Sequence, residues 1–124
     1  PAHLRLADGS GLSRHNLVTP EALVTTLQAM AVHPEADVFL ESLAVAGVSG
    51  TLRNRLAGTV LEKRVQGKSG ALTGNVSLSG YLQPPDYEPL VFSLLMNHSD
   101  QHASVLRDRI DEILLLMAQL SDDC

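Results

Sequence analysis

Between about residues 64 and 97, apolar and polar side chains alternate, and this period of two points to a sheet. The alternation is clearest where Val76, Leu78 and Leu82 are separated by polar or hydroxyl-bearing residues. Such a pattern places apolar side chains on one face of a strand and polar ones on the other. It predicts strands near 64–72, 75–83 and 90–97. Because the connections between them are short, we expect an antiparallel meander.

Helices are predicted on both sides of this region. Thr19 and Pro20 supply an N-cap and a proline at the first helical position, which predicts a helix over about 20–32. A second helix is predicted over about 101–120, where an apolar stripe lies opposite charged residues. The stripe consists of Leu106, Ile110, Ile113, Leu114, Met117 and Leu120, and the charged side of Arg107, Asp108, Asp111 and Glu112. The stripe should pack on the sheet, so the fold class is α/β (α+β), an antiparallel sheet with flanking helices.

The remaining composition sets limits on organisation and partners. Segment 37–58 has short apolar bursts broken by glycines, which indicates one or two short helices joined by turns. No repeat or linker divides the chain, so residues 1–124 are assigned to one domain or a piece of one. A formal net charge of −5 argues against general nucleic-acid binding, which needs an excess of Lys and Arg. No apolar run reaches the ~20 residues of a membrane span.

A Lys-Ser-Gly triplet, Lys68 to Gly70, lies near the start of the first predicted strand. Lys-[Ser/Thr]-Gly is the third motif of the serine acyl-transferases that bind penicillin, whose other two motifs are Ser-x-x-Lys and Ser-x-Asn. Neither of these occurs in the 124 residues, because valine stands three positions before both lysines and no asparagine follows a serine by two. We therefore expect the chain to be part of an enzyme.

Two longer stretches carry a family resemblance. The loop of residues 8–16, followed by Thr19-Pro20 and a helix, and the stretch of residues 67–82 resemble the D-alanyl-D-alanine carboxypeptidase/endopeptidase family of low-molecular-mass penicillin-binding proteins. The resemblance covers most of the chain and corresponds to the C-terminal part of the family's transpeptidase-like domain. It implies a partial penicillin-binding/β-lactamase-like transpeptidase fold and a periplasmic or cell-envelope location.

The resemblance implies catalytic roles for four consecutive residues. Lys68 would supply positive charge for the terminal carboxylate of the substrate, and the Ser69 hydroxyl would hydrogen-bond to that carboxylate. Gly70 would allow close backbone approach, and the Ala71 N–H would be one of two oxyanion donors. Ser69 departs from the more usual threonine but keeps the hydroxyl, so the chemistry should persist.

Arg14 and Thr73 are the expected substrate-binding residues outside this run. Arg14 would meet an acidic group of the stem peptide, although a solvated arginine, or one that supports Asp8, explains the loop equally well. The expected partners are peptidoglycan stem peptides, β-lactams and the remainder of the same protein, which would carry the two missing motifs. No cofactor or metal is expected, since His98 and His102 lack the glutamate of a His-Glu-x-x-His site.

Three interpretations of function follow. The first is a serine-type D-Ala-D-Ala carboxypeptidase/endopeptidase that works through an acyl-enzyme, in which this chain supplies the Lys-Ser-Gly strand and is inactive alone. The second is a non-catalytic module that binds a peptide or complements another chain. The third, a minor alternative, is a fragment of a class A-like β-lactamase, because Lys-Ser-Gly-Ala also resembles the corresponding motif of that class.

Overall fold

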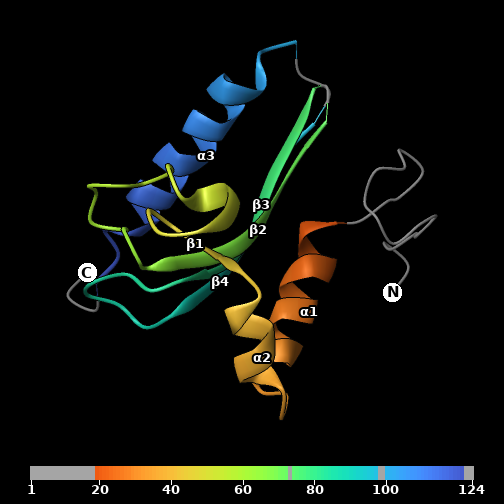
Figure 1. Cartoon of the computed structure of the whole chain (residues 1–124), viewed down its shortest axis with the longest axis vertical. Helices are drawn as coiled ribbons and strands as arrows, with labels where there is room; N and C mark the ends of the chain where they lie inside the picture. Colours follow the sequence, from red (N-terminus) through yellow and green to blue (C-terminus); the bar gives the residue numbers. More distant parts are fainter. Residues whose placement is uncertain (1–18, 73, 98–99, 122–124) are drawn as a thin grey trace.

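The computed structural model describes residues 19–72, 74–97 and 100–121. Three α-helices, one 3-10 helix (η1) and four strands make up this part of the chain. In order they are α1 (Pro20–Ala31), α2 (Ala36–Glu41), β1 (Ala44–Val45), η1 (Gly50–Leu52), β2 (Val65–Leu72), β3 (Asn75–Leu82), β4 (Leu90–Met96) and α3 (Ala103–Met117). The strands form one antiparallel sheet in the order β1-β2-β3-β4, with α1 and α3 on opposite faces (Figure 1). Within these residues no helix is long and apolar enough to cross a membrane.

Helix α1 begins and ends as its sequence predicts. The side chain of Thr19 accepts a hydrogen bond from the backbone N–H of Ala22 at 3.1 Å, and Pro20 occupies the first turn, where its missing N–H costs nothing. The helix ends at Ala31, three residues before Pro34. The tyrosine of β3, Tyr81, donates a hydrogen bond to the Leu27 carbonyl at 2.7 Å and so ties α1 to the sheet.

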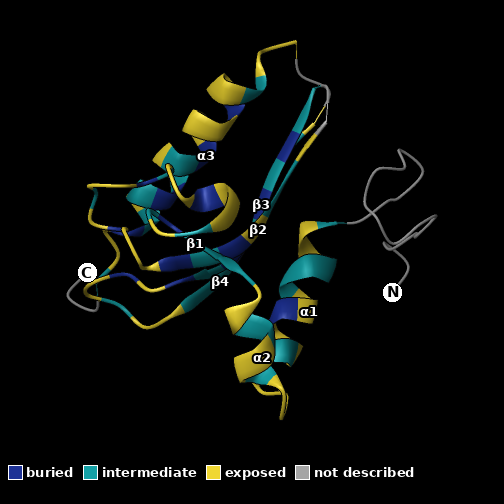
Figure 2. Cartoon of the chain, viewed as in Figure 1, coloured by how far each residue is buried: buried dark blue, intermediate teal, exposed yellow. Residues whose placement is uncertain are grey.

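The three long strands confirm the predicted meander. Burial alternates along β3, where Val76, Leu78 and Leu82 are buried on the face that also carries Ile110 and Leu114 of α3. The opposite face of β3 and β4 is covered by α1. Figure 2 shows the buried residues concentrated along the strands and on the inner side of α3. The sheet is thus the middle layer of three.

A fourth strand, β1, was not predicted from the sequence. It has two residues, with Ala44 opposite Gly67 and Val45 opposite Gln66. A strand this short has no period that a sequence pattern can reveal. The predicted segment 37–58 does contain its two short helices, α2 and η1, but β1 lies between them.

Helix α3 confirms the predicted stripe in part. Leu106, Ile110 and Leu114 are buried, but the helix ends at Met117, and Leu120, beyond that end, is 40% exposed. On the predicted charged side, Asp111 forms an ion pair with Arg55, a residue far away in sequence.

Strands β2 and β3 approach closely at one pair of glycines. Gly67 lies opposite Gly80, and a Cβ added to Gly80 would lie 2.0 Å from the Gln66 carbonyl oxygen. A Cβ added to Gly67 would lie 2.6 Å from the Ser79 carbonyl oxygen. Both positions therefore need a residue without a side chain. This close contact fixes the strand that carries the Lys-Ser-Gly triplet.

Candidate functional site at the open edge of strand β2

Strand β2 has one edge that is only partly covered. Its inner edge pairs with β3 from Val65 to Leu72, whereas its outer edge pairs with β1 only at Gln66 and Gly67. From Lys68 onward, no strand among the described residues pairs with the outer edge. The triplet occupies the fourth to sixth positions of the eight-residue strand, so it lies in the middle of β2 and not early in it as predicted. Beside the triplet, the outward-facing backbone groups of β2 therefore have no strand partner among the described residues.

Lys68 extends from the face of the sheet on which α1 and α2 pack. Its position is opposite Ser79, and its neighbour on that face, Gln66, donates a hydrogen bond to the Leu40 carbonyl of α2 at 3.3 Å. The Lys68 side chain is exposed, and its ammonium group donates to the Ser69 carbonyl. In the described part of the chain no carboxylate pairs with this ammonium group. Lys68 therefore presents an uncompensated positive charge at the open edge.

Two hollows meet at Lys68. The first has a volume of about 370 Å³ and lies beside β1 and η1. Its lining is formed by Glu41, Ser42, Leu43, Ala44, Ser49, Gly50, Thr51, Gly67 and Lys68. The second, of about 330 Å³, is mainly apolar and lies between α1, α2 and the sheet. It is lined by Leu23, Thr26, Leu27, Phe39, Ser42, Leu43, Lys68 and Ser79. A charged group can thus be held at Lys68 with an apolar group next to it.

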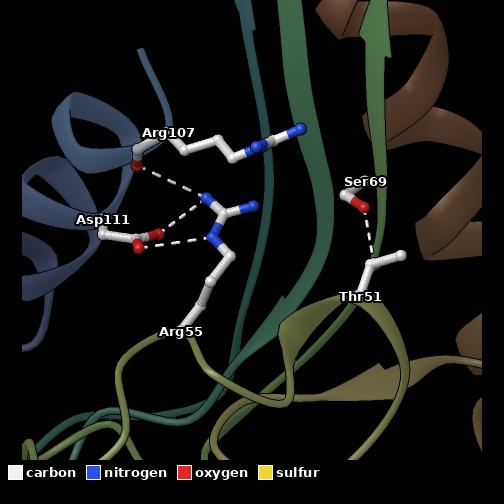
Figure 3. A network of polar contacts seen from close by, with 5 residues as sticks. All are labelled: Thr51, Arg55, Ser69, Arg107 and Asp111. Atoms are coloured by element: carbon white, nitrogen blue, oxygen red, sulfur yellow. Dashed lines mark hydrogen bonds and ion pairs between the residues drawn. The ribbon is translucent and has the colours of Figure 1, made fainter. Parts of the chain in front are cut away.

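Ser69 belongs to the other face of β2, the side covered by α3, because successive side chains of a strand alternate. Its hydroxyl donates a hydrogen bond of 2.6 Å to the hydroxyl of Thr51 in η1 (Figure 3). Gly70 has little free space, since an added Cβ would lie 2.9 Å from the Ser77 hydroxyl. Ala71 follows as an exposed residue. Sequence reasoning missed Thr51, because nothing in the pattern links residues 18 positions apart in this way.

The segment that carries Thr51 is anchored to α3. Arg55 donates hydrogen bonds to both carboxylate oxygens of Asp111, with Nη2 to Oδ1 at 2.7 Å and Nε to Oδ2 at 3.3 Å. A longer bond of 3.4 Å runs from Arg55 Nη2 to the Arg107 carbonyl. Figure 3 shows these contacts on the same side of the sheet as Ser69. The paired side chains are 11% and 17% exposed, so solvent screens the pair only partly.

The phenol of Tyr81 lies on the Lys68 face and is half-buried. Burial raises the pKa of Tyr81 above its ordinary value of 10.0, because the charged phenolate would lose solvation. The phenol is therefore neutral near neutral pH and serves as the donor to α1 described above. Through this bond Tyr81 contacts the backbone of Leu27, a residue that lines the apolar hollow.

Several predicted residues fall outside the described part of the chain. Arg14, Thr73 and His98 lie there, so their expected roles stay predictions. Within residues 19–72, 74–97 and 100–121, no group of three or more His, Cys, Asp or Glu side chains is placed to hold a metal ion. The structure aligns Lys68, Ser69, Gly70 and Ala71 along one open edge and adds Thr51 to them.

Comparison with known proteins links this chain to one family. The sequence model of the D-Ala-D-Ala carboxypeptidase 3 (S13) family matches residues 1–119. The D-alanyl-D-alanine carboxypeptidase of Actinomadura sp. (strain R39) is 44% identical over 115 residues, which are 88% of this chain and 21% of that protein. D-alanyl-D-alanine carboxypeptidase DacB of Haemophilus influenzae is 38% identical over 94 residues, 74% of this chain and 20% of that protein. The chain thus spans about a fifth of the length of these relatives.

Solved structures agree with the sequence match. Penicillin binding protein 4 (dacB) from Haemophilus influenzae aligns with a TM-score of 0.83 and 30% identity, over 94% of this chain and 28% of that one. A second structure of that protein, complexed with a novel β-lactam, aligns with a TM-score of 0.83 and 31% identity over 96% of this chain and 29% of that chain. The predicted transpeptidase-like fold is confirmed by this likeness.

Proposed function

This chain belongs to the D-Ala-D-Ala carboxypeptidase 3 (S13) family, and from that premise we propose that the whole protein is a serine-type D-Ala-D-Ala carboxypeptidase/endopeptidase. Its substrates are peptidoglycan stem peptides, and it acts in the periplasm or cell envelope. The chain supplies the strand that binds the substrate, and the nucleophile comes from a Ser-x-x-Lys motif elsewhere in the protein. The observation that carries the proposal is the open edge of β2, where Lys68 and Ser69 adjoin unpaired backbone groups.

An extended peptide fits this edge by adding a strand to the sheet. Beyond Gly67 the outer N–H and C=O groups of β2 have no strand partner among the described residues, and main-chain hydrogen bonds to a ligand satisfy them. Side chains from both faces of the sheet then contact the ligand at this edge. Lys68 offers charge on the α1 side, and Ser69 offers a hydroxyl on the α3 side. A peptide that ends in a carboxylate matches both groups.

The proposed reaction is acyl transfer in two steps. The serine nucleophile attacks the carbonyl of the penultimate D-Ala, an acyl-enzyme forms with release of the terminal D-Ala, and water then hydrolyses the ester. The Ala71 N–H is one donor to the oxyanion, a role worth about 3–4 kcal/mol where such donors have been removed. Lys68 and Ser69 hold the carboxylate of the leaving residue. Arg14 and Thr73 are further substrate contacts under the same proposal.

β-Lactams are proposed as ligands of the same edge. A structural relative is described as a complex with a β-lactam. A β-lactam presents a carboxylate close to a reactive carbonyl, so it makes the same demands on Lys68 and Ser69 as a D-Ala-D-Ala terminus does. The apolar hollow between α1 and α2 adjoins Lys68 and offers space for an apolar group.

The alternative function is a non-catalytic module that binds peptides or complements another chain. It is favoured by the open edge of β2, which can pair with an extended peptide whether or not a nucleophile lies beside it. The two functions differ in what they require of Lys68. An enzyme needs Lys68 for acylation, whereas a binding module needs it only for affinity.

The test uses the full-length protein that carries this chain and measures both release of D-alanine and covalent labelling by a fluorescent penicillin. Lys68→Met should abolish labelling at penicillin concentrations that label the unsubstituted protein fully. Lys63→Met is the matched control, because Lys63 is also exposed and is the only other lysine in these 124 residues. Full labelling of Lys68→Met, or an unsubstituted protein that binds the peptide without releasing D-alanine, would favour the binding module.

A further inference from the structure

Thr51 and Ser69 form a hydroxyl pair at the open edge of β2. The Ser69 Oγ donates to Thr51 Oγ1 at 2.6 Å, and Thr51 also lines the hollow that Lys68 adjoins. No family motif and no role in the proposed function accounts for Thr51. Its contact with the hydroxyl that faces the ligand sets it apart from other surface threonines.

The backbone around Thr51 is held by several independent contacts. The Ser49 hydroxyl accepts a hydrogen bond from the Val45 N–H at 3.1 Å, which joins the segment to β1. Gly50 has a φ of +59°, and its Cα packs so closely on Ala44 that an added Cβ would lie 2.9 Å from the Ala44 Cβ. Such a left-handed position favours glycine. Thr51 is therefore presented at a defined place beside β2.

The far end of the segment is fixed as well. The Arg55 N–H donates to the Leu52 carbonyl at 3.0 Å, and its guanidinium holds Asp111 of α3. The Thr51 hydroxyl is thus supported from β1 on one side and from α3 on the other. A side chain held in this way can orient a partner without a large loss of conformational entropy.

We infer that Thr51 is a positioning residue that orients the Ser69 hydroxyl toward the terminal carboxylate of the substrate, an inference that rests on the function proposed above. In the structure, the Ser69 hydroxyl donates its single proton to Thr51. A carboxylate has no proton to give, so Ser69 must turn its proton to the ligand. Thr51 then donates its own proton to Ser69 Oγ, since a hydroxyl is both donor and acceptor. The result is a chain of hydrogen bonds from Thr51 through Ser69 to the carboxylate.

This chain selects for a negatively charged terminus. A hydrogen bond to a charged acceptor is stronger than one between neutral groups, and each bond in a chain polarises the next. A carboxamide terminus does not require Ser69 to turn its proton away from Thr51. Its NH₂ group can donate to Ser69 while Ser69 still donates to Thr51. Thr51 should therefore favour a carboxylate over a carboxamide.

The experiment compares two peptide substrates of the full-length protein, one ending in D-Ala-D-Ala and the other in its C-terminal carboxamide. Thr51→Val removes the hydroxyl at nearly constant volume. We expect Thr51→Val to lower kcat/KM about tenfold for the carboxylate substrate, mostly through a higher KM. For the carboxamide substrate, kcat/KM should stay within about twofold of the value for the unsubstituted protein. Thr51→Ser should restore most of the loss, because it returns the hydroxyl.

Thr59→Val provides the matched structural control. Thr59 lies in the same connection but makes only local hydrogen bonds, donating to the Leu56 carbonyl at 2.6 Å and accepting from the Leu61 N–H at 3.2 Å. Thr59→Val should change thermal stability without changing the ratio of the kcat/KM values for the carboxylate and carboxamide substrates. Equal losses on both substrates in Thr51→Val, or a gain on the carboxylate substrate, would overturn the role of Thr51. An unsubstituted protein that releases no D-alanine would instead overturn the proposed function and, with it, the inference.

Discussion

Arg55 and Asp111 are 56 positions apart in sequence, yet they form a two-point ion pair in which Nη2 lies 2.7 Å from Oδ1 and Nε lies 3.3 Å from Oδ2. The pair joins the segment between β1 and β2 to α3 across the buried face of the sheet. The two donors lie in the fixed plane of the guanidinium and match the two carboxylate oxygens, a geometry that the rotatable ammonium of a lysine does not reproduce. The two residues therefore fix the position of the segment that carries Thr51.

Arg55→Lys should destabilise the full-length protein by about 1–2 kcal/mol, because one of the two charge-assisted bonds is lost in a largely buried setting. Urea denaturation followed by circular dichroism measures the change. Arg53→Lys is the control, because Arg53 is exposed, and it should change stability by less than about 0.5 kcal/mol. A double-mutant cycle with Asp111→Asn should give a coupling energy clearly above zero, and additivity would contradict a direct pair.

Gly80→Ala should prevent normal folding, because its Cβ would lie 2.0 Å from the Gln66 carbonyl oxygen of the paired strand. Backbone atoms can move away only by opening the β2–β3 ladder. Soluble yield and thermal midpoint measure the effect. Gly58→Ala is the comparison, since nothing lies within 4 Å of its Cβ and its φ of +75° should cost only about 1–2 kcal/mol. Equal soluble yields and thermal midpoints for the two variants would show that the close approach of β2 and β3 does not exclude a side chain at residue 80.

Tyr81→Phe should lower stability by about 1 kcal/mol near neutral pH, because the Leu27 carbonyl loses its donor. The difference from the unsubstituted protein should shrink at alkaline pH. Burial raises the pKa of Tyr81 above 10.0, so above that pH the unfolded chain releases a proton that the native protein retains. Stability is therefore lost as pH rises through the native pKa. Denaturation curves from about pH 8 to about pH 11 test this, and a constant difference would contradict it.

Ser69→Thr should keep the penicillin acylation rate of the full-length protein within about threefold, whereas Ser69→Ala should lower it about ten- to a hundredfold, the range for loss of a hydrogen bond to a charged group. Threonine retains the hydroxyl and adds one methyl group on the face covered by α3. Stopped-flow labelling with a fluorescent penicillin measures both rates. An unchanged acylation rate in Ser69→Ala would show that the Ser69 hydroxyl has no role in the proposed site.

The regular elements were predictable because their patterns are local. The alternation around Val76, Leu78 and Leu82 identified the sheet, and the Thr19-Pro20 pair identified the start of α1. Lys68 to Ala71 were found through a motif of three residues and its flanking sequence. Their roles stay predictions, whereas their alignment along one open edge is a property of the structure.

What the sequence concealed depends on contacts between distant segments. The sequence pattern placed Asp111 opposite the apolar stripe of its helix, but only the folded chain brings Arg55 to it. Thr51 lies in a segment with no period, and its link to Ser69 comes from the packing of η1 beside β2. Side-chain pairs across such separations leave no local pattern.

Strand β1 is only two residues long, and its length limits where another chain can pair with the outer edge of β2. Ala44 of β1 pairs with Gly67 and so covers the outer edge of β2 up to the residue before Lys68. An incoming strand can therefore extend along the edge in one direction only until it meets Ala44. One more paired residue in β1 would place Leu43 opposite Lys68, and one fewer would leave Gly67 without a partner on this edge. Under the proposed function, the length of this two-residue strand sets which residue of a paired peptide lies beside Lys68.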